Sequence, residues 1–164
     1  MNRYIIDGHN FIHQIPHYLK LLDKDYIQCQ KMLTNDLLHY SDTRKIIIIL
    51  VFDGNPPWDP EDETKLKVIF SGDNRSADDT IIQLCGKFPG GQTTVVTADK
   101  YILRGVREAD CQTTSPEQFY KLIKSKRQKI PKSILKEKPQ YLSPSEVEEW
   151  KREMLKEIKK RKED

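Results

Sequence analysis

The chain has 164 residues, of which 37% are hydrophobic and 32% charged, as expected of one globular domain with a short appendage. Its longest apolar run, residues 46–52, is far shorter than the ~20 residues of a membrane-spanning helix. The N-terminus reaches Asp7 too early for a signal peptide. The three cysteines include no CxxC pair, which argues against a disulfide framework or a zinc finger. We therefore expect a cytoplasmic protein with no membrane partner.

The net charge of +3 is unevenly distributed along the chain. Residues 1–123 carry a net charge of −3, residues 124–140 carry +6, and residues 141–164 carry none. A mildly acidic body is thus joined to a short basic segment. The sequence predicts three parts: a folded domain over residues 1–125, a basic linker over 126–142 and an amphipathic helix over 143–164.

Apolar periodicity predicts alternating strands and helices over the first 125 residues. Pro16 is expected to bend or interrupt the first helix. Four consecutive isoleucines, residues 46–49, show no polar alternation, which is typical of a strand buried on both faces of a parallel sheet. The order of elements indicates an α/β fold with a mainly parallel sheet covered on both faces. The expected strands are 4–6, 45–52, 65–70, 93–97 and 111–113, and the expected helices are 10–22, 25–40, 76–88, one after Asp99, and 115–124.

Aspartates fall where the expected strands end. Asp7 and Asp53 directly follow two strands, Asp99 closely follows a third, and Asp78 lies in the first turn of a helix that follows another. The carboxyl ends of parallel strands meet at one edge of the sheet, where open α/β sheets place their ligands. We therefore expect these four carboxylates, with Asn10 close behind Asp7, to gather at one site.

A cluster of carboxylates is costly without a cation, because like charges at close range repel one another. All-oxygen ligands favour Mg²⁺ or Mn²⁺ over Zn²⁺, and such an ion suits phosphoryl chemistry. The alternative is that each aspartate is only a turn former or a helix cap. That alternative is strongest at Asp79, where Ser76 three residues earlier completes a capping-box pattern. Agreement among four separate segments favours the metal site.

Four short motifs resemble those of the NYN domain family of PIN-like nucleases, in particular its small bacterial branch. They are I-I-D-G-H-N-F-I at residues 5–12, V-F-D-G at 51–54, S-A-D-D-T-I-I at 76–82 and V-V-T-A-D-K at 95–100. The resemblance covers roughly residues 3–125. It implies a Rossmann-like three-layer α/β/α sandwich of the PIN-like type, followed here by a C-terminal helical extension.

The resemblance also implies a metal-dependent endoribonuclease that uses a metal-activated water to cleave single-stranded or exposed RNA, such as mRNA. Asn10 would orient the first acid or contact the phosphate, Asp79 would supplement the metal site and Ser76 would support it. The implied catalytic residues are Asp7, Asn10, Asp53, Asp78 and Asp99, and the implied metal ligands are Asp7, Asp53, Asp78, Asp79 and Asp99. The implied cofactor is Mg²⁺ or Mn²⁺, and the products would carry 5′-phosphate and 3′-hydroxyl ends.

The basic segment admits two interpretations, a solvated linker or a clamp for the phosphate backbone of RNA. Trp58 is a candidate for stacking on unpaired bases. RNA is the expected partner, the ribosome is a candidate partner, and the sequence makes no prediction about oligomeric state. The candidate RNA-binding residues are Lys100, Arg104, Lys124, Lys126, Arg127 and Lys129.

Two other functions remain open at this point: a non-catalytic RNA- or ribosome-binding module, and a nuclease or phosphatase acting on DNA or a phosphate ester. His9, His13 and His17 are spaced by four, but a surface or packing role is favoured for them because Pro16 disturbs the helix. The acidic, proline-rich loop over residues 55–63 has no assigned role.

Overall fold

The computed structural model describes residues 1–88 and 91–125, together with a few positions between Ser145 and Lys159. The chain divides into two units, Met1–Arg127 and Gln128–Asp164, and all elements named below belong to the first. The predicted basic linker over residues 126–142 and most of the predicted amphipathic helix over 143–164 lie outside the described residues. Within the described part of the chain, no helix combines the length and the apolar character needed to cross a membrane.

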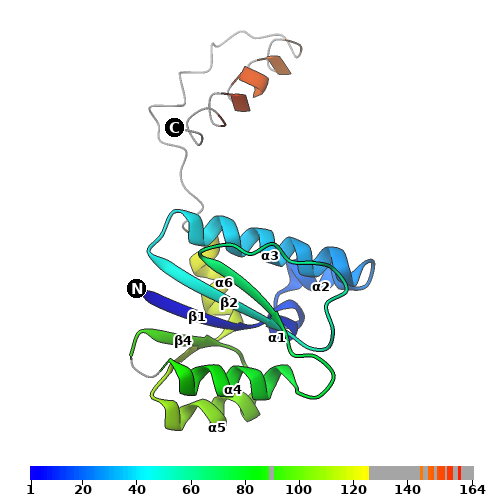
Figure 1. The fold of residues 1–164 in the computed structure, drawn as a ribbon. Helices are drawn as coiled ribbons and strands as arrows, with labels where there is room; N and C mark the ends of the chain where they lie inside the picture. Colours follow the sequence, from blue (N-terminus) through cyan, green and yellow to red (C-terminus); the bar gives the residue numbers. More distant parts are fainter. Residues whose placement is uncertain are drawn as a thin grey trace. The chain divides into compact units, whose positions relative to one another are not determined.

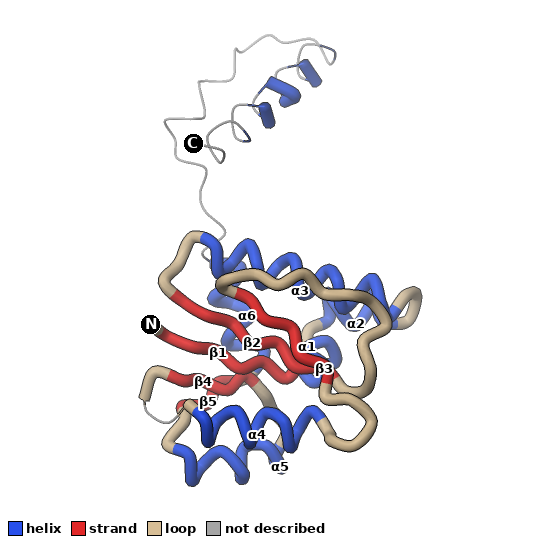
Figure 2. The backbone as a smooth tube through the Cα atoms, viewed as in Figure 1, coloured by secondary structure: helices blue, strands red, loops and turns tan. Residues whose placement is uncertain are grey.

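Five parallel strands form the central sheet in the order β3-β2-β1-β4-β5 (Figure 2). They are β1 (Asn2–Asp7), β2 (Ile46–Phe52), β3 (Leu66–Phe70), β4 (Thr93–Val96) and β5 (Gln112–Thr114). The helices are α1 (Gly8–Gln14), α2 (Pro16–Leu22), α3 (Tyr26–Asp42), α4 (Ala77–Lys87), α5 (Lys100–Val106) and α6 (Pro116–Ser125), with a short 3₁₀ turn at Arg107–Ala109.

Successive side chains of β2 point into two separate cores, as the period of a strand requires. Leu50 and Phe52 belong to the core beneath α1, α2, α3 and α6, whereas Ile49 and Val51 belong to the core beneath α4 and α5. Figure 1 shows these helices on opposite sides of the sheet. The predicted three-layer α/β/α sandwich is therefore confirmed, and the isoleucine run is the strand buried on both faces.

The predicted elements agree with the structure to within two residues at each end, except at Pro16. The expected single helix over residues 10–22 is two helices, since α1 ends at Gln14 and Pro16 is the first residue of α2. Proline has no N–H to donate within a helix, but the first turn of a helix does not need that donor. Pro16 therefore interrupts the expected helix, which is one of the two predicted effects, and starts α2.

The order of the strands creates a switch point beside β1. The chain places β2 and β3 in turn on one side of β1, and then crosses to the other side to place β4 and β5. The connections that leave the carboxyl ends of β1 and β4 consequently diverge, which opens a crevice between them. Asp7 ends β1 at this crevice, and residues 97–99 follow β4 into it.

Candidate active site

A pocket of about 340 Å³ lies at the carboxyl edge of the sheet. It brings together the four aspartates that follow different strands, and we call it the acid pocket. Its lining residues are Asp7, His9, Asn10, His13, Asp53, Ala77, Asp78 and Asp99. Residues from four separate segments of the chain therefore face one space.

Asp7 is the most buried of the four aspartates, with 4% of its surface exposed. Its Oδ1 accepts a hydrogen bond from the Asn10 backbone N–H (3.4 Å), and its Oδ2 accepts one from the Thr97 hydroxyl (3.2 Å). Burial, with a smaller contribution from the charges of Asp78 and Asp99, raises the pKa of this carboxyl to about 6, although the two hydrogen bonds oppose the rise. Asp7 therefore holds a proton more readily than an exposed aspartate.

Gly8 allows the start of α1 to lie directly against the end of β2. A Cβ atom at this position would lie 2.4 Å from Cε1 of Phe52 and 3.0 Å from the carbonyl oxygen of Val51. Only a residue without a side chain permits this approach. The close packing sets Asp7, the N-cap of α1, beside the end of β2, which Asp53 follows.

Asp53 links the loop after β2 to the beginning of α4. Its Oδ1 accepts hydrogen bonds from the Ala77 backbone N–H (2.8 Å) and from the Ser71 hydroxyl (3.3 Å). The Ser71 Oγ also accepts the Gly54 backbone N–H (3.1 Å). Oδ2 forms no hydrogen bond with any described residue. One oxygen of Asp53 therefore holds the local structure together, and the other is left for a ligand.

Thr97 joins the loop after β4 to the acid pocket, and sequence reasoning gave it no role. Its side chain is 2% exposed; the hydroxyl donates to Asp7 Oδ2 and accepts the Asp99 backbone N–H (3.0 Å). The Asn10 Oδ1 accepts the Ala98 backbone N–H (2.9 Å) in the same region. The sequence feature that points to Thr97 is its position, because it is a hydroxyl residue between the end of a buried strand and an acidic residue.

Asp99 and Asp78 differ in how they are held. Asp99 is the N-cap of α5, where its Oδ1 accepts the backbone N–H groups of Tyr101 (2.8 Å) and Ile102 (3.4 Å). Asp78, half-buried in the first turn of α4, forms no hydrogen bond with any described residue. Burial raises the pKa of Asp78, and the charges of the other acids add to the effect. Asp78 therefore has both oxygens available for a ligand.

The structure does not bring Asp79 into the acid pocket. Ser76 caps α4 as predicted, because its Oγ accepts the Asp79 backbone N–H (3.1 Å). The Asp79 carboxylate does not accept the Ser76 backbone N–H, as a complete capping box would require. It accepts the Tyr101 hydroxyl on α5 instead (3.0 Å). Asp79 thus ties α4 to α5, which does not favour the predicted role as a supplementary metal ligand. Ser76 lies outside the lining of the pocket and acts through the start of α4.

His9 and His13 are exposed side chains, as a surface role requires, and they lie at the lining of the acid pocket. They lie one turn apart on α1, with ring centroids 4.3 Å apart. Burial lowers the pKa of His9, the charge of His13 lowers it further, and Asp53 opposes this. His17 is separated from them by the break at Pro16 and packs on Tyr18, with ring centroids 5.1 Å apart.

The donor set of the acid pocket fits a hydrated hard cation better than a closed metal centre. Among the residues that the structure describes, no three His, Cys, Asp or Glu side chains form a group that could hold a metal ion. Zn²⁺ needs three or four such direct ligands. Mg²⁺ usually keeps several waters and takes only one or two carboxylates directly. The free oxygens of Asp53 and Asp78, beside two further carboxylates, are compatible with Mg²⁺ or Mn²⁺.

None of the candidate RNA-binding residues that the structure describes lines the acid pocket. Lys100 and Arg104 are exposed on α5, and the Lys124 ammonium lies 4.8 Å from the centroid of the Tyr120 ring. Lys126, Arg127 and Lys129 lie outside the described residues. Trp58 is half-buried and donates its indole N–H to Gln30 Oε1 (3.1 Å). It therefore packs within the fold and does not stand free beside the pocket for base stacking.

Comparison with known proteins identifies the family. A family model for the YacP-like NYN domain matches residues 4–163. The chain belongs to the YacP-like NYN domain family. NYN domains are part of the PIN-like nuclease superfamily, so this YacP-like chain carries a nuclease-like domain. No curated protein matches the chain.

Two solved structures resemble the YacP-like chain in fold. The crystal structure of Rae1 (YacP) from Bacillus subtilis has a TM-score of 0.71 and 20% sequence identity, over 99% of this chain and 93% of that one. A mutant of the same Bacillus subtilis protein has a TM-score of 0.66 and 20% identity, over 76% of each chain. At this identity the likeness shows the shared fold.

Proposed function

We propose that this YacP-like NYN protein is a metal-dependent endoribonuclease that cleaves single-stranded or exposed RNA, mRNA included. The observation that carries the proposal is the acid pocket, where Asp7, Asp53, Asp78 and Asp99 arrive from four segments of the chain. Backbone N–H groups hold three of these carboxylates in place. Membership of a nuclease-like family supports the same chemistry.

A bound Mg²⁺ or Mn²⁺ would supply positive charge to the phosphodiester and lower the pKa of a water molecule. Asp53 and Asp78 present unengaged oxygens to such an ion. A bound cation would favour the ionised form of Asp7, since it would offset the burial and the neighbouring charges that raise the pKa of this carboxyl. The Thr97 hydroxyl is hydrogen-bonded to both the Asp7 carboxylate and the Asp99 backbone N–H, so it would hold these two groups in fixed relative positions beside the ion.

Asn10 is suited to contact the phosphate. Its backbone N–H is used by Asp7, and its side-chain oxygen accepts the Ala98 N–H. The side-chain amide nitrogen forms no hydrogen bond with any described residue, and it can donate to a phosphate oxygen in the pocket. Of the two roles expected for Asn10, phosphate contact is therefore the one we propose.

Binding of the RNA backbone is assigned to basic side chains outside the pocket. Lys100 and Arg104 lie on α5, which begins immediately after Asp99, so they are close in the chain to the proposed reaction site. Lys124 lies in the last turn of α6. Because they are positively charged, Lys126, Arg127 and Lys129 are assigned further contacts with the RNA phosphates. Such contacts give affinity without sequence preference. The ribosome is retained as a candidate partner.

The test uses the full-length protein with unstructured RNA, structured RNA, single-stranded DNA, flap DNA and a small phosphate ester. With Mn²⁺ or Mg²⁺ we expect cleavage of the unstructured RNA to products with 5′-phosphate and 3′-hydroxyl ends, and none in chelator. Asp7→Asn and Asp99→Asn should abolish cleavage, whereas Glu117→Gln on α6 should retain it.

Three outcomes would contradict the proposal in different ways. Cleavage unchanged in both aspartate variants would remove the acid pocket from the reaction. Chelator-insensitive RNA or ribosome binding without products would indicate a non-catalytic binding module. Preferred cleavage of DNA or of the small ester would replace RNA as the substrate.

A further inference from the structure

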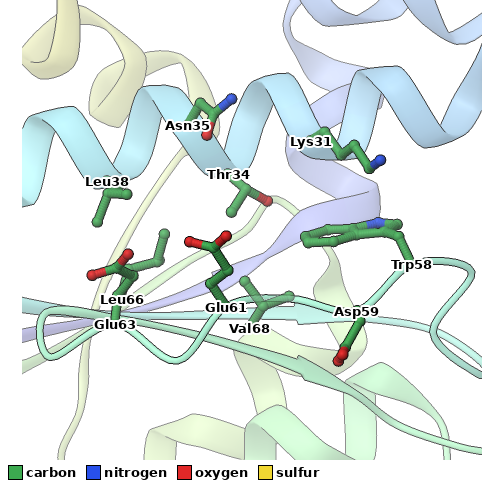
Figure 3. A pocket seen from close by; sticks show the side chains of 10 residues that line it. All are labelled: Lys31, Thr34, Asn35, Leu38, Trp58, Asp59, Glu61, Glu63, Leu66 and Val68. Carbon is green, nitrogen blue, oxygen red and sulfur yellow. The ribbon is translucent and has the colours of Figure 1, made fainter.

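A second concave surface lies between α3 and the loop that joins β2 to β3, away from the acid pocket. This groove has a volume of about 310 Å³ and shares no lining residue with the acid pocket. Figure 3 shows α3 along one side of it, the loop along the other and side chains of β3 beneath. The loop is the acidic, proline-rich segment over residues 55–63.

The floor and one end of the groove are apolar. Leu66 on β3 is 2% exposed, and Val68 and Leu38 beside it are half-buried. Trp58 stands at one end of the groove (Figure 3), where its indole packs on Phe70 at a centroid distance of 5.9 Å. An apolar floor of this kind gains free energy when an apolar side chain covers it.

The loop is fastened at both ends. At its start, the Asn55 side-chain amide donates to Asp73 (2.6 Å), and the Gly72 backbone N–H donates to the Gly54 carbonyl (2.9 Å). At its end, the Lys65 ammonium donates to the carbonyl oxygens of Asp42 (2.8 Å), of Ser41 before it and of Arg44 just beyond α3.

The middle of the loop is held as well. The Trp58 indole N–H donates to Gln30 on α3 (3.1 Å), and prolines at residues 56, 57 and 60 restrict the backbone on either side. The groove is therefore formed before any ligand arrives, which lowers the entropy cost of binding.

The rim of the groove is negatively charged and unpaired. Four of the five residues 59–63 are acidic, and three of them, Asp59, Glu61 and Glu63, line the groove opposite a single cation, Lys31. Within the described part of the chain, none of these carboxylates forms a hydrogen bond or an ion pair. The Glu61 carboxylate points toward α3 across the groove (Figure 3). The rim therefore attracts cationic ligands and repels nucleic acid.

We propose that this groove binds a basic segment of a partner protein. An apolar side chain of the segment covers Leu66 and Val68, while flanking Lys or Arg side chains pair with Glu61 and Glu63. A phosphate backbone is excluded by the sign of the rim. A single metal ion is disfavoured because no hydrogen bond within the described part of the chain fixes the direction of these carboxylates, unlike those of the acid pocket. The proposal is independent of the nuclease activity, since no residue of the acid pocket takes part.

The experiment measures binding of fluorescein-labelled peptides to the full-length protein by fluorescence anisotropy. The probe is a short peptide of alternating lysine and leucine. Its companions replace leucine by serine, which keeps the charge, or lysine by glutamate, which keeps the apolar side chains. We expect the lysine–leucine peptide to bind most tightly, the lysine–serine peptide more weakly and the glutamate–leucine peptide not at all.

Variants then locate the binding site. The double change Glu61→Gln/Glu63→Gln removes two exposed charges and should weaken the lysine–leucine peptide about five-fold, in line with exposed ion pairs. Val68→Thr keeps the branched shape but replaces a methyl group by a hydroxyl, and should weaken this peptide about three-fold without affecting the lysine–serine peptide. Glu108→Gln/Glu117→Gln removes the same charge elsewhere and should leave the affinity unchanged. Circular dichroism confirms that each variant is folded.

Several results would overturn the proposal. If the wild type and Glu61→Gln/Glu63→Gln bound the lysine–leucine peptide equally well, the carboxylates of the rim would not take part in binding. If the lysine–serine and lysine–leucine peptides bound equally well, the groove would recognise positive charge alone and not an apolar side chain. Loss of affinity in Asp78→Asn/Asp99→Asn, with none in the rim variant, would place the peptide in the acid pocket.

Discussion

The molecule carries two groups of four acids that are built in opposite ways. The carboxylates of the acid pocket come from positions as far apart in the chain as Asp7 and Asp99, and the fold gathers them. The carboxylates of the acidic loop, residues 59–63, are neighbours in sequence. Backbone N–H groups hold three of the first group, whereas the described part of the chain supplies no partner to the second. Only the first group has the fixed geometry that chemistry requires.

The difference teaches what each group can do. A carboxylate with one oxygen held by the backbone presents its other oxygen in a defined direction, as Asp53 does. Such positioning accounts for a large part of catalysis. An exposed carboxylate without partners contributes charge but little direction, which suits recognition of a flexible cationic partner. We therefore assign the cleavage reaction to the acid pocket and the attraction of a cationic partner to the acidic loop.

The largest expected effect compares the same chemical change in both groups. Asp53→Asn/Asp99→Asn should lower kcat/KM for RNA cleavage by at least about 100-fold, because it removes charge that holds the cation. Asp59→Asn/Glu61→Gln removes equal charge from the loop and should change kcat/KM by less than about two-fold. The assay is cleavage of a fluorogenic RNA with Mn²⁺. Similar losses of kcat/KM in the two variants would show that the two groups of acids do not differ in their role in cleavage.

The second prediction concerns stability and pH. The Asp7 carboxyl has its ordinary pKa near 3.8 in the unfolded chain and a pKa of about 6 in the fold, so the folded state binds the extra proton. Stability should therefore fall as pH rises from about 4 to 6 and remain lower above that. Asp7→Asn cannot titrate and should be more stable than wild type by about 3 kcal/mol at pH 8, with most of this advantage lost at pH 4.

Urea unfolding in chelator at both pH values measures this difference. Added Mn²⁺ should stabilise the wild type at pH 8 and leave Asp7→Asn nearly unchanged, since the cation replaces the proton at the pocket. The same pH dependence in both proteins would show that Asp7 is not the group responsible.

The third prediction tests Thr97 as a positioning residue. Thr97→Val keeps the shape and removes the hydroxyl that joins Asp7 to the Asp99 backbone, so kcat should fall about ten-fold with little change in KM. Thr97→Ser restores the hydroxyl and should recover most of kcat. Steady-state cleavage kinetics separate the two parameters. If serine were no better than valine, the hydrogen bonds would not be the cause.

The smallest effect is expected from the loop in the absence of a partner. Asp59→Asn/Glu63→Gln should change the free energy of unfolding by less than about 0.5 kcal/mol, toward stabilisation, because repulsion among neighbouring carboxylates is relieved. The gain should disappear at high salt. Urea unfolding at two salt concentrations measures it. A large loss of stability would mean that these carboxylates have structural partners and would contradict their assignment to a free rim.

Local patterns in the sequence predicted the elements and the layers correctly. Period-two and period-3.6 repeats of apolar residues depend only on near neighbours, and the unbroken isoleucine run already required a strand buried on both faces. Aspartates after strands were then expected at one edge, since parallel strands share a direction. Asp7, Asp53, Asp78 and Asp99 lie there in the structure.

Only the tertiary structure decided which way side chains point and what they meet. The hydrogen bond from Thr97 to Asp7 joins residues 90 positions apart, so no local pattern contains it. Asp79 turns to Tyr101, and Trp58 turns to Gln30, because elements distant in the chain pack beside them. The sequence by itself determined the acids and their edge of the sheet. The packing of distant segments determined which of their oxygens stay free to bind.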